Sequence, residues 1–218
     1  VYWRDSSAAK QTLQCFNQQL DFSALQGCDM FYFSGITLAI LSDSDRAQLF
    51  ELVQQLKASG SQIVFDPNYR PALWPHADNA KAAFIQAYSL ADVALPGLDD
   101  HKVLFGAQTT NDVVEQLVEL GVAEIIVKDG KNGINGRYQQ KGFTAQVHAV
   151  KKVVDTTAAG DSFNGGYLAA RLGGIAPQHA VKFAARLAGF VVEHTGAIVS
   201  KDHFNGFWAQ NRPSVFVK

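Results

Sequence analysis

Short apolar segments alternate with helical patterns along most of this 218-residue chain. Strands are predicted at 30–33, 63–65, 92–95 and 125–127, and helices between them at 42–60, 75–90 and 110–120. Parallel strands need long crossover connections, which are usually helices. The alternation therefore predicts an α/β fold, with a mostly parallel, doubly wound sheet and helices on both faces.

Local signals define the ends of several predicted elements. Ser42 is a predicted N-cap, and Gly60 ends the same helix. A further helix at the start of the chain is indicated by Leu13, Phe16 and Leu20. Towards the C-terminus, helices are expected at 161–173, 177–194 and 201–209. The sequence shows no linker, repeat or low-complexity segment, so one domain spanning 1–218 is expected.

The segment "NGINGRYQQKGFTAQVHAV" (132–150) interrupts this alternation. Its turns and its alternating residues predict an antiparallel hairpin at the edge of the sheet.

Composition excludes several classes of function. The net charge is −1 and 47% of the residues are apolar, so nothing indicates a nucleic-acid partner or an anionic membrane surface. The longest largely apolar stretch, 31–41, is too short to span a bilayer. Cys15 and Cys28 form no metal-binding, redox or disulfide spacing. We expect a cytoplasmic protein.

Polar or glycine-rich residues follow each predicted parallel strand. These segments are "SG" (34–35), "DPNYR" (66–70), "PGLDD" (96–100) and "KDG" (128–130). Ligands of open α/β sheets bind at the carboxyl ends of the strands. The four segments are therefore candidates for one binding region.

The segment "DTTAAGDSFNGGYL" (155–168) opens a predicted helix with small residues and a carboxylate. A helix N-terminus carries unpaired N–H groups, and small residues at 158–160 let an anion approach them. Asp161 beside such an anion site would need its own task, such as accepting the proton of an attacking hydroxyl. The alternative is that Asp161, Thr156 or Thr157 only caps the helix.

The same segment resembles the C-terminal signature of the ribokinase-like (PfkB-type) carbohydrate kinases, usually written D-T-T-G-A-G-D. Alanine at 158 replaces the commoner glycine. "YWR" (2–4) and "FDPNYRPALW" (65–74) are similar to the branch that phosphorylates 2-keto-3-deoxygluconate. The likeness runs in order along essentially the whole chain. It implies the three-layer α/β/α ribokinase-like fold, with ATP, Mg²⁺ and a small-molecule acceptor as ligands and a homo-oligomer at full length.

The resemblance also implies roles for residues of the second half of the chain. Asp161 matches the catalytic base, and the amides of Ala158, Ala159, Gly160 and Asp161 match the anion hole. Residues implied to border the nucleotide are Lys128, Gly130, Gly133, Asn164, Gly196 and Ala197. Asp155 and Thr157 match positions at which family members can hold a monovalent cation such as K⁺.

A sugar acid is the expected acceptor. Arginine binds carboxylates through paired planar donors, and Arg4 and Arg70 match substrate positions together with Tyr2. The alternatives are a solvated Arg4 and a structural ion pair for Arg70. Asp66 and Asn68 either bind sugar hydroxyls or close a turn.

Two departures from the family pattern bear on this expectation. "PGLDD" places Gly97 and Asp100 where many members carry N-x-x-E, so Asp100 is left to hold the magnesium through water. The N-terminal third of a typical member, with its first strands and most of the β-sheet lid, has no counterpart in these residues. The chain thus corresponds to the C-terminal two-thirds of a single kinase domain.

Three functions follow from these observations. The favoured one is an ATP-dependent kinase that converts 2-keto-3-deoxygluconate to its 6-phosphate. The second is a kinase of the same family for a neutral sugar such as fructose, or for a nucleoside, which would have no need of both arginines. The third is a non-catalytic, nucleotide-binding fragment.

Overall fold

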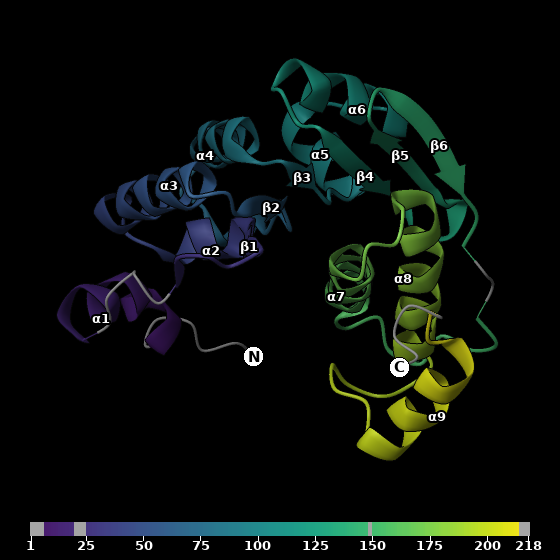
Figure 1. Cartoon of the computed structure of the whole chain (residues 1–218). Helices are drawn as coiled ribbons and strands as arrows, with labels where there is room; N and C mark the ends of the chain where they lie inside the picture. The colour runs from purple at the N-terminus through teal and green to yellow at the C-terminus, as the bar shows by residue number, and fades with distance from the viewer. Residues whose placement is uncertain (1–6, 20–24, 148–149, 214–218) are drawn as a thin grey trace. The chain divides into compact units, whose positions relative to one another are not determined.

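The computed structural model describes residues 7–19, 25–147 and 150–213. Tyr2 and Arg4 therefore lie outside the described residues. Contacts divide the chain into two compact units, 1–127 and 128–218, which are described separately (Figure 1). The prediction of a single domain stays a prediction.

The first unit alternates helices with strands. Its elements in chain order are η1 (Ala8–Gln11), α1 (Thr12–Gln19), β1 (Met30–Ser34), α2 (Gly35–Ile40), α3 (Asp43–Ala58), β2 (Gln62–Asp66), η3 (Pro71–Leu73), α4 (Ala77–Leu90), β3 (Val93–Ala94), α5 (Leu98–Phe105), α6 (Thr110–Glu119) and β4 (Glu124–Lys128). The last residue of β4 begins the second unit.

The strands of this unit are parallel, as the alternation predicts. Ser34 on β1 is in register with Asp66 on β2, and Phe65 on β2 is in register with Ala94 on β3. Strand β3 in turn pairs in parallel with β4. The ends of β1 and β2 therefore lie at one edge, where α2 and the segment 66–74 begin.

An aromatic group around Phe84 forms the centre of the first unit's core. Phe84 is fully buried, and its ring meets those of Phe65, Tyr69 and Trp74 in edge-on contacts at 5.5, 6.0 and 5.7 Å. Edge-to-face pairs of this kind add stability beyond the area they bury. The segment that follows β2 is thereby anchored to helix α4.

Two short helices of the first unit escape sequence prediction. Helix α2 begins at "SG", where Ser34 and Thr37 form a capping box. Helix α5 begins in "PGLDD" after Gly97 and ends at Gly106, whose φ is +74°. Each helix is too short for its apolar residues to show a helical repeat that differs from the adjoining apolar segments.

The second unit holds the predicted hairpin and the C-terminal helices. Its elements are η4 (Gly130–Asn132), β5 (Ile134–Tyr138), β6 (Lys141–Ala145), α7 (Ala159–Leu172), α8 (Pro177–Val192) and α9 (Lys201–Asn211). Strands β5 and β6 are antiparallel, from Ile134 opposite Ala145 to Tyr138 opposite Lys141. The antiparallel hairpin is therefore confirmed.

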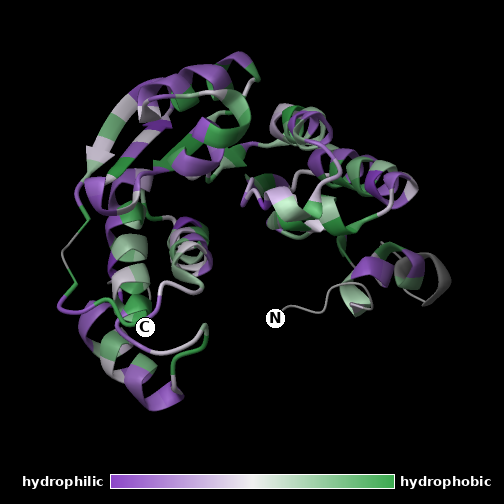
Figure 2. Ribbon diagram, turned by 180° about the vertical axis from the view of Figure 1, so that it is seen from behind, coloured by the Kyte–Doolittle hydropathy of each residue, from purple (hydrophilic) through white to green (hydrophobic). Residues whose placement is uncertain are grey.

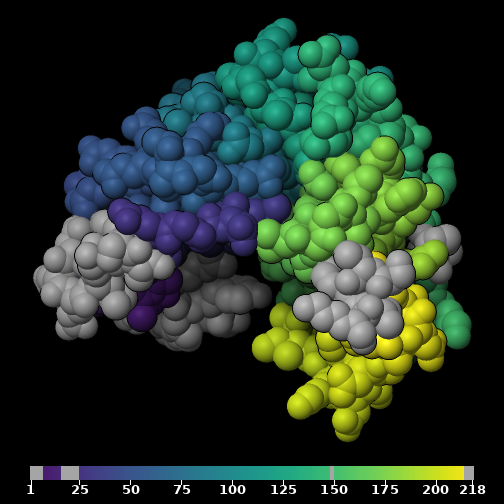
Figure 3. Space-filling view, in the orientation of Figure 1, coloured from purple at the N-terminus to yellow at the C-terminus, as the bar shows by residue number. Residues whose placement is uncertain are grey.

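Helices α7 and α8 pack closely. A Cβ atom added to Gly166 of α7 would lie 3.3 Å from the Cα atom of Ala184 on α8, so glycine permits the approach. Figure 2 shows hydrophilic and hydrophobic residues interleaved along α8, as expected of a helix with one buried face. Helix α9 has no buried residue over its described length, and its atoms lie at the surface in Figure 3.

None of the helices in the described ranges has the length and apolar character needed to cross a membrane.

Candidate functional site

A cavity of about 520 Å³ lies within the second unit. Its walls are formed by the turn after β4, the first turns of α7 and one face of α8. Its lining residues are Lys128, Gly130, Lys131, Gly133, Ile134, Val147, Val150, Ala159, Gly160, Phe163, Ala185, Ala188, Gly189 and Val192. Five residues predicted from the sequence, namely Lys128, Gly130, Gly133, Ala159 and Gly160, are thus brought together.

Lys128 is held at this cavity by a hydrogen bond to Asn164. Its Nζ donates to Oδ1 of Asn164 at 2.9 Å and lies 5.8 Å from the centre of the Phe163 ring. Asn164 is only 2% exposed, and it is not among the lining residues. The structure therefore places Asn164 as a support for the lysine, which the sequence alone did not indicate.

The cavity reaches the first turn of α7. Ala158 precedes the helix in the left-handed conformation, with φ of +61°, and supplies no side-chain cap. The N–H group of Ala159 donates to Thr156 O at 3.2 Å, so this member of the predicted anion hole has a partner within the turn. Asp161 lies exposed in the first turn, where the positive end of the helix dipole stabilises a carboxylate.

Gly133 is required by the shape of the turn after β4. Its φ of +114° lies in a region that other residues rarely adopt, and an added Cβ would approach Ala145 O to 2.7 Å. The wall of the cavity at this point is therefore formed by backbone.

Asp155 joins two loops near the start of α7. One carboxylate oxygen accepts the N–H of Thr157 at 2.8 Å and the other accepts the N–H of Gly196 at 2.9 Å. Hydrogen bonds from the Thr157 side chain, the Thr157 backbone and the Gly196 backbone lower the pKa of Asp155 below its usual value. Gly196 is thus tethered to Asp155, and neither it nor Ala197 lines the cavity.

In the first unit, Asp66 is buried at the carboxyl end of β2. Only 3% exposed, its carboxylate accepts the hydroxyl of Tyr32 at 3.3 Å. Asn68 follows with φ of +34°, a value typical of tight turns. Burial of Asp66 favours the turn-closing alternative over direct contact with a sugar hydroxyl.

Arg70 is exposed, whereas Tyr69 before it is buried. Its Nη1 donates to Tyr69 O at 3.3 Å. Arg70 directly precedes η3, whose first residue is Pro71. No ion pair of Arg70 occurs within the described part of the chain, so the structural ion-pair alternative finds no support there.

A buried polar chain behind this segment was missed by the sequence analysis. Tyr88 and His101 are hydrogen-bonded at 2.8 Å, and Nδ1 of His101 lies 3.4 Å from Oε1 of Gln116. Burial raises the pKa of Tyr88, and the charges of Asp66 and Asp100 raise it further. Burial also lowers the pKa of His101 to about 4, although the hydrogen bond to Gln116 opposes this.

The predicted metal-binding residue Asp100 is engaged with the backbone. Its Oδ2 accepts the N–H of Tyr69 at 3.2 Å, which ties the start of α5 to the segment after β2. Across the described ranges no three His, Cys, Asp or Glu residues gather closely enough to hold a metal ion by themselves. Mg²⁺ usually needs only one or two carboxylates when substrate phosphates complete its shell, so a single carboxylate such as that of Asp100 has the donor chemistry that such a metal uses.

Parallel strands, an antiparallel hairpin and a cavity against a helix start define the class, an α/β fold of the ribokinase-like type. A putative ribokinase II from Escherichia coli, in complex with ATP and Mg²⁺, superposes with a TM-score of 0.73 at 28% identity, covering 83% of this chain and 57% of that one. Residues 1–203 match the pfkB family of carbohydrate kinases, and the chain belongs to this family.

Two similar proteins carry different sugar-kinase names. The chain is 38% identical over 203 residues to 2-dehydro-3-deoxygluconokinase of Haemophilus influenzae, covering 92% of this chain and 65% of that protein. It is 31% identical over 172 residues to a probable fructokinase-7 of Arabidopsis thaliana, covering 77% of this chain and 48% of that protein. The chain thus spans just under two-thirds of the Haemophilus relative and about half of the plant one.

Proposed function

We propose that this protein transfers the γ-phosphoryl group of ATP to the 6-hydroxyl of 2-keto-3-deoxygluconate, also called 2-dehydro-3-deoxygluconate. The observation that carries the proposal is the cavity joining Lys128 to the start of α7, in a chain 38% identical to a 2-dehydro-3-deoxygluconokinase. A cavity of about 520 Å³ is within the usual range of small-molecule sites.

The cavity suits a nucleotide because its lining combines two kinds of chemistry. The α8 wall is lined by Ala185, Ala188, Gly189 and Val192, small or apolar residues against which a planar base can pack. The same lining includes the Lys128 ammonium and the first turn of α7 at Gly160, which favour phosphate. Bound Mg²⁺ would supply charge neutralisation of the phosphates.

Asp161 is proposed as the general base. It is exposed in the first turn of α7, next to Gly160, which lines the cavity. A carboxylate there can accept the proton of the acceptor hydroxyl, while the neighbouring N–H groups stabilise negative charge on the transferred group. The competing role is electrostatic only: a carboxylate in the first turn stabilises the helix dipole and needs no hydroxyl substrate.

Arg70 is proposed to bind the carboxylate of the sugar acid, with Tyr2 and Arg4 assigned from the sequence. The exposed guanidinium of Arg70 sits on a turn stiffened by Pro71, which preorganises its planar donors. A neutral sugar is the second candidate, favoured by the similarity to the plant fructokinase.

We further propose a single kinase domain, a homo-oligomer, a cytoplasmic location and a K⁺ site at Asp155 and Thr157.

Asp161→Asn tests the base. Turnover of 2-keto-3-deoxygluconate is expected to fall about 10²–10⁴-fold, the usual contribution of a positioned base, while nucleotide binding measured by calorimetry stays unchanged. Asp202→Asn is the matched control, because Asp202 also lies in the first turn of a helix in the same unit. Near-normal turnover of the Asp161 variant would show that this carboxylate is not the base and only stabilises the helix dipole.

A substrate panel tests the acceptor. ADP release is measured with 2-keto-3-deoxygluconate, gluconate, fructose and ribose at equal ATP. The proposal expects the highest kcat/KM for 2-keto-3-deoxygluconate. A preference for fructose or ribose would move the protein to the neutral-sugar function, and release with none of them, despite ATP binding, would favour the nucleotide-binding fragment.

A further inference from the structure

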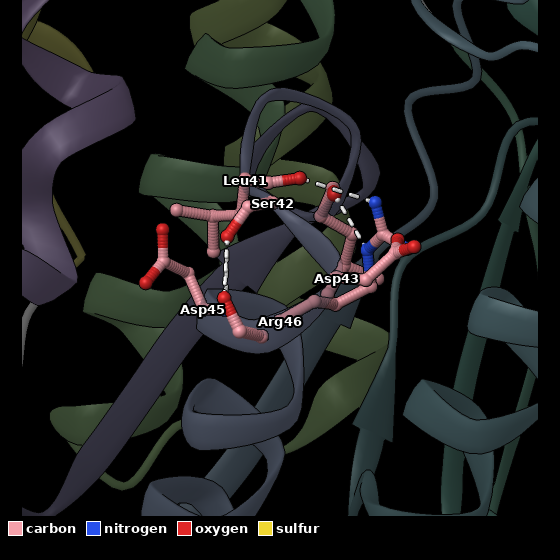
Figure 4. Close-up of polar contacts among 7 residues, drawn as sticks. Leu41, Ser42, Asp43, Asp45 and Arg46 are labelled. Carbon is pink, nitrogen blue, oxygen red and sulfur yellow. Dashed lines mark hydrogen bonds and ion pairs between the residues drawn. The ribbon is translucent and has the colours of Figure 1, made fainter.

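Arg46, near the start of α3, bonds the end of α2. Its Nε donates to Leu38 O at 2.9 Å and its Nη2 donates to Leu41 O at 3.2 Å (Figure 4). The last carbonyls of a helix have no partner within the helix, so one guanidinium satisfies two of these acceptors. Its Nη1 also pairs with Asp43 at 2.9 Å, but that side chain is 97% exposed and such a pair contributes little.

The same guanidinium lies over the ring of Trp74. The Cζ atom of Arg46 is 5.1 Å from the ring centre. Trp74 is 7% exposed, and its Nε1–H has no hydrogen-bond partner among the described residues. Because no hydrogen bond fixes the indole, its orientation rests on packing against Arg46 and Phe84.

Trp74 closes the turn that Arg70 opens. The N–H of Leu73 donates to Arg70 O at 2.9 Å and the N–H of Trp74 donates to Pro71 O at 3.1 Å. Pro71 has a fixed φ, so the turn has little freedom to absorb a displacement of the indole. A shift of Trp74 is therefore passed to Arg70.

Helix α2 touches the other end of the same segment. Its first residue, Gly35, lies so close to Pro67 that an added Cβ would be 1.9 Å from the proline carbonyl oxygen. Arg46 therefore contacts both neighbours of the segment 66–74: it bonds the end of α2, whose first residue meets Pro67, and it lies over the ring of Trp74.

We propose that Arg46 is a positioning residue for Arg70, which fixes the segment 66–74 in the conformation that receives the sugar-acid carboxylate. The inference rests on the proposed function, because that function assigns the carboxylate to Arg70. Arg46 itself does not contact substrate. If its loss lowers the fraction of molecules with a competent segment to a tenth, apparent substrate affinity falls about tenfold.

Steady-state kinetics of Arg46→Leu give the first test. We expect KM for 2-keto-3-deoxygluconate to rise about tenfold, with KM for ATP and kcat nearly unchanged. Arg46→Lys should behave like the leucine variant, because an ammonium has neither the planar face nor the fork that reaches two carbonyls. Asp43→Asn should match the wild type, since it removes only the exposed pair.

A stability control separates positioning from general destabilisation. Val113→Ala shortens a fully buried side chain of α6, a helix that is not among the described contacts of Arg46, and is expected to lower stability without a change in KM for the sugar acid. If this variant raises KM for the sugar acid as much as Arg46→Leu does, Arg46 has only a structural role. A wild-type KM in Arg46→Lys would also contradict the inference that the planar guanidinium is required.

Hydrogen exchange tests the same inference without any substrate. Backbone amides of 69–74 should exchange about tenfold faster in Arg46→Leu, and at wild-type rates in Asp43→Asn and Val113→Ala. Unchanged exchange in Arg46→Leu contradicts the proposal. Because this readout needs no sugar, it still decides the role of Arg46 if the protein proves to phosphorylate a different acceptor.

Discussion

At the scale of single residues, exposure separates two neighbours that the sequence treats alike. Asp66 is 3% exposed and bonds the Tyr32 hydroxyl, whereas Arg70 is exposed at the start of η3. A buried carboxylate with a partner shapes the segment. An exposed arginine on a rigid turn is available for an anionic ligand.

Arg70→Leu is therefore expected to raise KM for 2-keto-3-deoxygluconate about 10–150-fold, which corresponds to the roughly 1.5–3 kcal/mol of a charge-assisted hydrogen-bonded pair. KM for ATP should not change. Arg137→Leu, on β5, is a control that removes an arginine from the other unit. If KM for fructose rises as much as KM for the sugar acid, Arg70 does not bind the carboxylate.

At the scale of elements, helix starts decide the local geometry. Helix α2 starts at Gly35, which approaches Pro67, and helix α7 starts after Ala158 in the left-handed conformation. The first requires glycine for space. The second shows why the family signature has glycine where this chain has alanine, since a Cβ is unfavourable at that φ.

Gly35→Ala should destabilise the first unit by about 3 kcal/mol, at the upper end for overpacking, because the new Cβ meets a backbone oxygen. Denaturant unfolding measures the change. Gly165→Ala, in the exposed middle of α7 with no atom within 4 Å of the added Cβ, should instead stabilise by about 0.5–1 kcal/mol. Equal effects of the two substitutions would contradict the close approach at Gly35.

Ala158→Gly should raise stability by about 0–1.6 kcal/mol. Glycine removes a left-handed strain of about 1–2 kcal/mol but gives the unfolded chain about 0.4–1 kcal/mol of extra entropy. Thermal unfolding measures the sum. Ala169→Gly, in the exposed interior of the same helix, is the opposite control and should cost about 1 kcal/mol. A loss at both positions would mean that residue 158 is not left-handed in solution.

At the scale of the whole molecule, a buried histidine couples stability to pH. His101 is 1% exposed, and its folded pKa of about 4 is below the ordinary value of 6.5. Between these two values the unfolded state binds more protons than the folded state. Stability is therefore fully present above about pH 6.5 and is lost as the pH falls towards about 4.

The free energy of unfolding of the first unit is expected to fall by about 3 kcal/mol between pH 6.5 and pH 4 from this group. Denaturant titrations at several pH values measure the slope. His101→Gln should flatten it, although stability at pH 7 is lower, whereas His179→Gln on the exposed surface should leave it unchanged. If the two units unfold in separate transitions, the His101 contribution should appear in only one of them.

Local sequence signals predicted most elements because they depend on neighbours in the chain. Ser42 caps α3 as expected, accepting the N–H of Asp45 at 3.1 Å, and the hairpin forms within the predicted segment. The motif at 155–168 likewise places Asp161 in the first turn of a helix, although α7 begins at Ala159, earlier than predicted. Helix capping, hydrophobic periodicity and turn residues depend on neighbours in the chain, so they can be recognised in a single sequence.

By itself, the sequence therefore determined the parallel α/β class, the antiparallel hairpin, the helix start at 158–161 and the family. Only the tertiary structure decided that Asn164 hydrogen-bonds Lys128, that buried Asp66 accepts the Tyr32 hydroxyl, and that Arg46 lies over the Trp74 ring. Each of these contacts joins residues about 30 or more positions apart in the chain. Such pairs depend on strand register and helix packing, which are set by the burial of the whole core and leave no local pattern in the sequence.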